Sequence, residues 1–183
     1  MNMEKPMKKP LVLTVAFILM LAALTGQAKP DCSTDIIEQI RPSVSDLPEG
    51  FMFGRIPGFA QKVLKGNPWL MDRRAMKRLA SRIYPDGDFS KMSAVHMTIM
   101  ADTKTPFGDD IVCYIIVYRD KSSAKGEIKK LLKFAGYNND RVLVLSKENM
   151  VVFLHVDDTI NFHHIQELAG KMGRKLEKIP CRG

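Results

Sequence analysis

Eight consecutive apolar residues, Ile111 to Tyr118, constrain the fold of this chain more than any other segment. Alternate residues of a strand point to opposite faces of its sheet, and this segment is apolar at both sets of positions. It is also dense in β-branched and aromatic residues, which favour strands. We therefore predict a central strand over 110–119 and, from a similar composition, a preceding strand over 92–101.

A helix is predicted before these strands, beginning at Asn67-Pro68 and ending at Pro85-Asp-Gly87. Asparagine is a good N-cap, and proline suits the first helical turn. Apolar residues then recur at helical spacing, whereas the opposite side is basic. The apolar positions are Trp69, Met76, Leu79, Ala80 and Ile83.

Two more helices follow the strands, with a hairpin between them. The first begins at Ser122 or Ser123 and ends at Gly136, which suits the position after a helix; its apolar stripe is Ala124, Ile128, Leu131, Leu132 and Ala135. The hairpin joins strands over 141–146 and 150–156. The last helix follows Asp157-Asp-Thr159 and buries Phe162, Ile165, Leu168, Met172, Leu176 and Ile179.

The resulting order, α-α-β-β-α-β-β-α, predicts an α+β domain over 57–183. Its core would be a four-stranded, mainly antiparallel sheet with helices packed on one face. Pro57 marks the start of the first helix. Residues 29–56 are rich in Pro, Ser and Asp, and we predict an irregular leader there with a short helical possibility over 36–40.

The first 28 residues predict a secretory signal peptide. Lys5, Lys8 and Lys9 precede an apolar run over 11–24, and Gly26 and Ala28 form a small-x-small cleavage site. The run is shorter than the ~20 apolar residues that span a bilayer. Lipidation would require a cysteine directly after the signal, which Cys32 is not. The chain is therefore expected to be exported as a soluble protein, to the periplasm or the exterior.

The three cysteines are interpreted in that compartment, where thiols tend to pair. Cys32 and Cys181 lie close to the two ends of the exported chain, and domain termini are often neighbours, so we predict a disulfide between them. Cys113 lies in the apolar strand, where a cysteine usually packs as a small hydrophobic residue. A reactive thiol at Cys113 is the alternative, without an activating motif to support it.

The C-terminal two-thirds resembles a family of small exported proteins of unknown function that is common in Bacteroidetes. The likeness rests on the segments Glu127–Tyr137, Val142–Val156 and Thr159–Ala169. Members are often lipid-anchored, unlike this chain, and residues 29–68 do not clearly match them. The resemblance implies the architecture and an envelope location, and it brings no catalytic residues.

A metal site is one functional hypothesis. His163 and Glu167 are four residues apart on the last predicted helix, so both side chains would share one face. A metal needs three or four converging ligands, however, and a solvated face is the simpler reading. His96, Met97 and Met100 raise the possibility of copper handling, but on a strand Met97 faces away from the other two. Core packing is the simpler interpretation of these methionines.

Two basic clusters are the features that most suggest a function. The chain has a formal net charge of +8. One cluster is Arg73, Arg74, Lys77, Arg78 and Arg82, and the other is Lys171, Arg174, Lys175 and Lys178. Clustered cations attract an anionic surface or an acidic protein, although they also serve solubility. Nucleic acid is not expected, since the chain is exported and no stacking aromatics accompany the charges.

We therefore predict a non-catalytic binding module of the cell envelope, without a cofactor, that uses its basic helix faces. No nucleophile elbow, zinc-protease motif or glycine-rich phosphate loop occurs. Two alternatives stay open: a metal-binding accessory protein that uses His163 and Glu167, and an enzyme assembled from dispersed residues.

Overall fold

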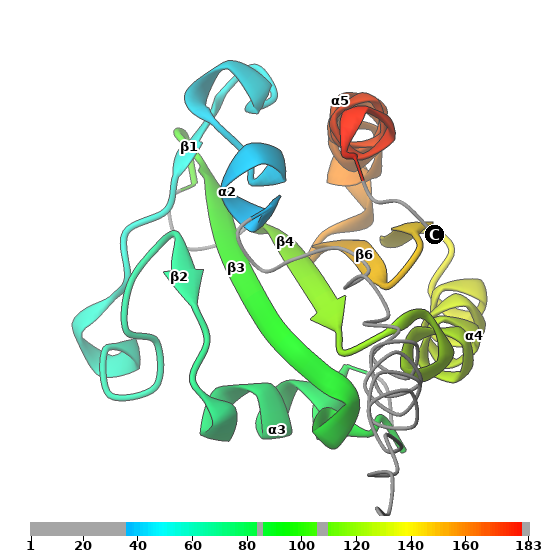
Figure 1. Ribbon diagram of the computed structural model, residues 1–183. Coiled ribbons are helices and arrows are strands. Elements are labelled where there is room, and N and C mark those ends of the chain that lie inside the picture. Colours follow the sequence, from blue (N-terminus) through cyan, green and yellow to red (C-terminus); the bar gives the residue numbers. More distant parts are fainter. Residues whose placement is uncertain (1–35, 84–85, 106–109, 181–183) are drawn as a thin grey trace, which may run out of the picture.

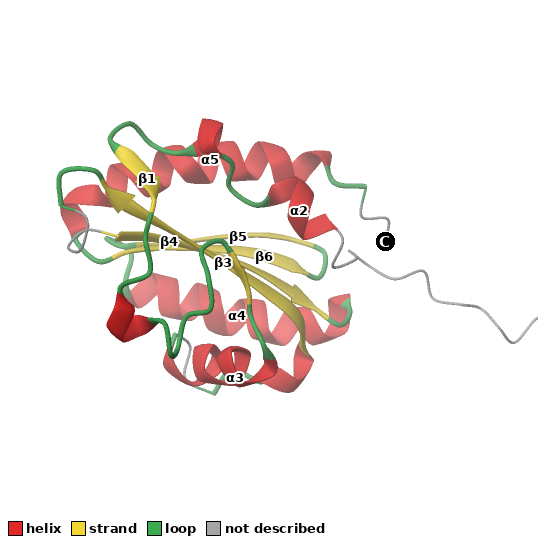
Figure 2. Ribbon diagram, turned by 90° about the vertical axis from the view of Figure 1, so that its left-hand side faces the viewer, coloured by secondary structure: helices red, strands yellow, loops and turns green. Residues whose placement is uncertain are grey.

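The computed structural model describes residues 36–83, 86–105 and 110–180. A β-sheet with long and short strands forms the middle layer, and helices cover both of its faces (Figures 1 and 2). Helices α2 (Ile37–Ile40) and α5 (Phe162–Lys178) lie on one face. Helices α3 (Arg73–Arg82) and α4 (Lys121–Tyr137) lie on the other. The domain is therefore a three-layer α/β/α sandwich.

Within the described residues the sheet has six strands, and every neighbouring pair is antiparallel. The order is β1-β3-β4-β6-β5, and β2 also pairs with β3. The strands are β1 (Phe51–Phe53), β2 (Trp69–Leu70), β3 (Met92–Asp102), β4 (Asp110–Tyr118), β5 (Val142–Lys147) and β6 (Met150–Val156).

The α+β class and the antiparallel sheet are confirmed, but the expected count of four strands is wrong. The additional strands β1 and β2 each pair with the outer edge of β3, at Met52↔Ala101 and Trp69↔Met97. Two or three residues are too few to show a strand periodicity, so only the tertiary fold identifies them. They satisfy backbone groups of β3 that the four long strands alone would leave unpaired.

Helices on a single face were also wrongly expected, and the central strand shows why. Along β4, Cys113 and Ile115 pack against α5 and α2, whereas Ile116 and Tyr118 pack against α3 and α4. Both sets are almost fully buried. A strand that is apolar on both faces requires a covering layer on each side, because either face would otherwise expose apolar surface to water.

The N-terminal part of the described chain belongs to this sandwich. Ile37 and Ile40 of α2 are buried against α5. The 3-10 turn η2 (Val44–Asp46) follows, and Phe51 of β1 completes the same core cluster. Residues 36–56, which we expected to be irregular apart from a helical turn, thus contribute a strand and part of the core.

The helix expected to begin at Pro57 is only the 3-10 turn η3 (Gly58–Ala60), so the predicted order of elements is wrong there. The other 3-10 turns are η4 (Phe89–Lys91) and η5 (Thr159–Asn161). The two predicted long strands, the hairpin and the last helix are present at or within a few residues of their expected ends. The N-cap of α4 is Asp120, whose carboxylate accepts from the Ser123 amide at 2.6 Å, and the helix continues past Gly136 to Tyr137.

No described helix is both long enough and apolar enough to cross a bilayer.

Candidate functional site

Helix α3 begins five residues later than the sequence indicated. Asp72, rather than Asn67, is its N-cap, and the Asp72 carboxylate accepts from the Ala75 amide at 2.8 Å. Trp69, expected on the buried side of the helix, lies instead in strand β2. The helix buries Ala75, Met76, Leu79 and Ala80 against the sheet. Its basic side chains therefore occupy the face that points to solvent.

The five cationic side chains of α3 have three different surroundings. Arg73 and Lys77 lie over the ring of Phe89, at 5.9 and 5.8 Å from its centroid. Arg78 and Arg82 border a cavity of about 140 Å³ whose lining includes Val63, Leu64 and Trp69. Arg74 is exposed between these two pairs. None of the five forms an ion pair with a residue of the described ranges; Arg73, Arg74, Lys77 and Arg82 are exposed, and Arg78 is half-buried.

The second basic cluster, on α5, is different because half of it is used inside the protein. Lys175 forms an ion pair with Asp46 and donates to the Arg41 carbonyl at 3.1 Å. Lys171 pairs with Glu167 at 2.7 Å and donates to the Asp46 carbonyl at 3.3 Å. These two lysines hold the segment after α2 against α5. Only Arg174 and Lys178 of the predicted cluster are exposed.

Asp46 is the acceptor that makes this junction. Burial by itself raises the pKa of the Asp46 carboxyl, but hydrogen bonds from Lys175 and Ser43 outweigh burial and lower that pKa below its ordinary value. The Ser43 hydroxyl donates to the carboxylate at 2.5 Å and the Ser43 amide donates to it at 2.7 Å. Helices α3 and α5 lie on opposite faces of the sheet (Figure 2), so the two basic clusters that they carry form no single patch.

The segment between β1 and β2 adjoins α3 and is fixed at both ends by one residue, Asn67. The Asn67 side-chain amide donates to the carbonyls of Gly54 at 2.8 Å and Ile99 at 2.7 Å. Its side-chain oxygen accepts from the Ile99 amide at 2.8 Å. Gly54 lies so close to β3 that an added Cβ would meet the Ile99 Cγ2 atom at 3.2 Å. Both ends of the segment 55–66 are therefore held to β3, and the residues between them project from the sheet.

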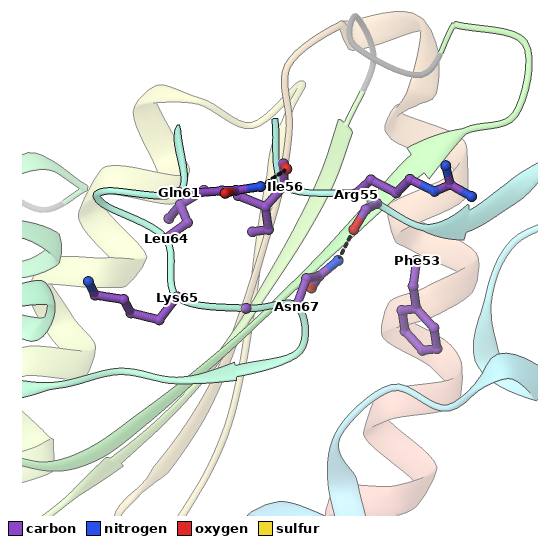
Figure 3. Close-up of a pocket in the computed structure, with 9 residues that line it drawn as sticks. Phe53, Arg55, Ile56, Gln61, Leu64, Lys65 and Asn67 are labelled. Atoms are coloured by element: carbon purple, nitrogen blue, oxygen red, sulfur yellow. Dashed lines mark hydrogen bonds between the residues drawn. The ribbon is translucent and has the colours of Figure 1, made fainter. Parts of the chain in front are cut away.

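The segment itself, with the residues at its two ends, lines a cavity of about 660 Å³ (Figure 3). Its lining includes Arg55 and Lys65, whose side chains extend in opposite directions in Figure 3. The Gln61 amide crosses it to the Ile56 carbonyl at 3.5 Å. Because its two cations do not converge, the cavity lacks the focused donors of a small-anion site.

The outer side of the segment is both apolar and basic. Phe59 is 87 % exposed and Val63 is 46 % exposed. Lys62 and Lys65 are exposed beside them. From residue 54 to residue 82 the sequence contains eight cations and a single anion, Asp72. Most of the excess positive charge of the chain is thus concentrated in this segment and α3.

Comparison of the chain with protein-family models, with curated proteins and with solved structures gives no significant match.

The metal hypothesis gains no third ligand from the structure. His163 directs its Nδ1 atom to the Ile160 carbonyl at 2.9 Å, and its ring is tilted by 39° to that of His164, with 3.8 Å between the centroids. Glu167 is already paired with Lys171. Over residues 36–83, 86–105 and 110–180, no group of three or more His, Cys, Asp or Glu side chains could hold a metal ion.

The sulfur-containing residues singled out in the sequence pack as core. Met97 lies in the cluster around Trp69, and Met100 lies in the cluster under α5, on the other face of the sheet. Cys113 is a buried free cysteine, and burial raises the pKa of its thiol to about 12. Its predicted role as a buried hydrophobic residue is confirmed. Cys32 and Cys181 lie outside the described residues.

The carboxylate of Glu127 on α4 is fully buried, which the sequence did not indicate. It accepts from the Asp88 amide at 3.0 Å and pairs with Lys91 at 3.2 Å and Lys130 at 2.9 Å. Lys130 also donates to the Asp86 carbonyl at 2.6 Å. These contacts join α4 to η4. The Glu127 carboxylate is occupied by donors of the protein itself, so the network serves to hold these elements together.

Sequence reasoning thus found the basic face of α3 but missed the residues that extend it. The sequence gave only a weak indication that Phe59 and Val63 are exposed. These two apolar residues lie near Lys62 and Lys65 and do not continue a buried helical stripe. Asn67 has the residue type of a helix cap, and its contact with Ile99, which is 32 positions away, has no local signature.

Proposed function

We propose that this chain is an exported, non-catalytic interaction module that binds an anionic surface through the basic face of α3. The observation that carries the proposal is the set of five α3 cations, none paired with a carboxylate of the described residues. Opposite charges in contact lower the free energy of binding, and free cations need no internal ion pair to be broken first.

The geometry favours α3 over α5 for this role. On α5, Lys171 and Lys175 would have to leave Asp46 before they could bind an external anion. On α3, Arg74 and Arg82 are exposed, and Arg73 and Lys77 lie over Phe89, which leaves their charges available. A stacked cation keeps its positive charge while losing some conformational freedom.

Retention on immobilised heparin tests the proposal, because heparin presents dense anionic groups without an apolar phase. The variant Arg74→Glu/Arg82→Glu should elute at a distinctly lower salt concentration than the unaltered protein, since binding through several ion pairs is screened by salt. The control Arg174→Glu/Lys178→Glu makes the same change in net charge on the opposite face of the sheet.

Elution of the control close to the unaltered protein would locate binding at α3. Equal shifts in both variants would show that retention follows net charge alone, and the basic face would then serve only solubility. Circular dichroism of each variant would verify that the fold is retained.

A further inference from the structure

The segment 55–66 and helix α3 together form one continuous surface. Val63 and Leu64 from the segment and Arg78 and Arg82 from α3 line the same cavity of about 140 Å³. Leu64 points inward and packs on the cluster that contains Trp69. Val63 therefore adjoins Arg78 and Arg82, and Phe59, Lys62 and Lys65 are exposed on the same short segment. We call Phe59, Lys62, Val63 and Lys65, with Arg74, Arg78 and Arg82, the loop–helix surface.

The segment winds tightly between Pro57 and Leu64, and it exposes both Phe59 and Val63. The Val63 and Leu64 amides both donate to the Ala60 carbonyl, at 2.9 and 2.8 Å. The Ala60 amide donates to the Pro57 carbonyl at 2.9 Å. The bonds from the Ala60 and Val63 amides span three residues, as in a 3-10 helix, in which side chains three residues apart lie on one side. Lys62 therefore shares the side of Phe59, and Val63, the next residue, is also exposed.

This combination distinguishes between kinds of anionic surface. A soluble polyanion would bind the cations but would gain nothing from an exposed phenyl ring. A bilayer offers phosphates at its surface and acyl chains just below, so it binds cations and apolar side chains side by side. Phe59, 87 % exposed in the free protein, would lose its contact with water by entering the acyl region.

Resting on the proposed function, we propose that the anionic surface is a lipid bilayer. Phe59 and Val63 insert at the boundary of the acyl chains, and Lys62, Lys65, Arg74 and Arg82 contact the lipid phosphates. Asn67 contributes by holding both ends of the segment to β3, so that little conformational freedom is lost on insertion.

Co-sedimentation with vesicles tests this inference, using the full chain after the processing that the producing cell carries out. One vesicle preparation contains phosphatidylcholine alone, and the other contains phosphatidylcholine with phosphatidylglycerol. The protein should bind the second preparation in preference to the first. Every variant carries the same N-terminus, so differences among variants report on the loop–helix surface.

Phe59→Ser/Val63→Ser should weaken binding to the anionic vesicles about tenfold, while retention on heparin is unchanged. Arg74→Glu/Arg82→Glu should weaken both, by about tenfold or more on vesicles. The control Ile160→Ser removes an exposed apolar side chain, 71 % exposed, that precedes α5 on the other face of the sheet, and it should bind as the unaltered protein does.

The outcomes separate the two proposals. Vesicle binding that is insensitive to Phe59→Ser/Val63→Ser would refute insertion, and the proposed function would stand if the arginine variant still lost heparin retention. Failure of the arginine variant to alter either measurement would refute both. As a direct readout, Phe59→Trp should show a blue shift of its emission on anionic vesicles, because the new indole leaves water.

Discussion

The side chain of Asn67 pairs with the backbone of Ile99 as a neighbouring strand would, donating to its carbonyl at 2.7 Å and accepting from its amide at 2.8 Å. Ile99 lies between the residues of β3 that pair with β2 and those that pair with β1. One amide side chain thus fills the gap between two short strands, and it fixes the base of the segment that carries Phe59.

Replacing Asn67 by alanine should reduce the free energy of unfolding by about 1–3 kcal/mol, because the Ile99 amide and two carbonyls lose partly buried partners. Gln61→Ala, in the same segment, removes only one hydrogen bond of 3.5 Å and should cost almost nothing. Urea unfolding of both variants measures the difference. A similar stability for the two variants would contradict the role given to Asn67.

The Asp46 junction should make stability depend on pH. The pKa of Asp46 is lowered in the folded protein, so its contribution to stability is complete above the ordinary pKa of an aspartate, about 4, and is lost as the pH falls through the folded value. Asp46→Asn should therefore be less stable than the unaltered protein at neutral pH, and the difference should shrink in acid.

Unfolding by urea at a series of pH values measures this change. Asp140→Asn is a suitable control, because that carboxylate is 55 % exposed and its only ion pair among the described residues is with the adjacent Arg141. A pH-independent difference for Asp46→Asn would rule out the ionised pair with Lys175 as its source.

The Glu127 network should be asymmetric in its response to mutation. Lys91→Met/Lys130→Met leaves a fully buried carboxylate without either cation and should cost about 3 kcal/mol or more. Glu127→Gln removes the charge, keeps an acceptor for the Asp88 amide, and leaves two partly exposed lysines that can reach water. It should cost about 1–2 kcal/mol. Lys129→Met, at an exposed neighbour in α4, is the control, and thermal unfolding ranks the variants.

Cys113 should resist alkylation in the native protein. Its thiol is fully buried, and its pKa of about 12 leaves almost no thiolate at neutral pH. Peptide mass spectrometry after treatment with iodoacetamide should find Cys113 unmodified in buffer and modified in urea. Rapid modification in buffer would show that β4 opens locally.

The disulfide between Cys32 and Cys181 stays a prediction that intact mass can test. Near the two ends of the described chain, the Arg41 carbonyl accepts from Lys175, so the segments that lead to the two cysteines start from neighbouring positions. The exported protein should begin at Lys29 and be lighter than its reduced form by the mass of two hydrogen atoms. A mass that is unchanged on reduction would exclude the bridge.

Local patterns explain why most elements could be predicted. β3, β4, the hairpin of β5 and β6, and α5 each have at least six residues of consistent strand or helix periodicity, and their ends carry turn or capping residues. Where a local pattern predicted the wrong burial for a side chain, contacts between distant residues determined that burial. Leu132 fits the apolar stripe of α4 yet is 52 % exposed, whereas Glu127, a charged residue, is buried by Lys91 and Lys130.

By itself the sequence determined the α+β class, the central position of β4 and the basic face of α3, because these follow from spacing between near neighbours. The tertiary structure decided which cations are free: Lys171 and Lys175 are engaged because Asp46, more than a hundred residues away, folds back onto α5. It also decided that Asn67 closes the base of the segment that exposes Phe59 beside α3. Contacts between distant residues set these features, and no local pattern encodes such contacts.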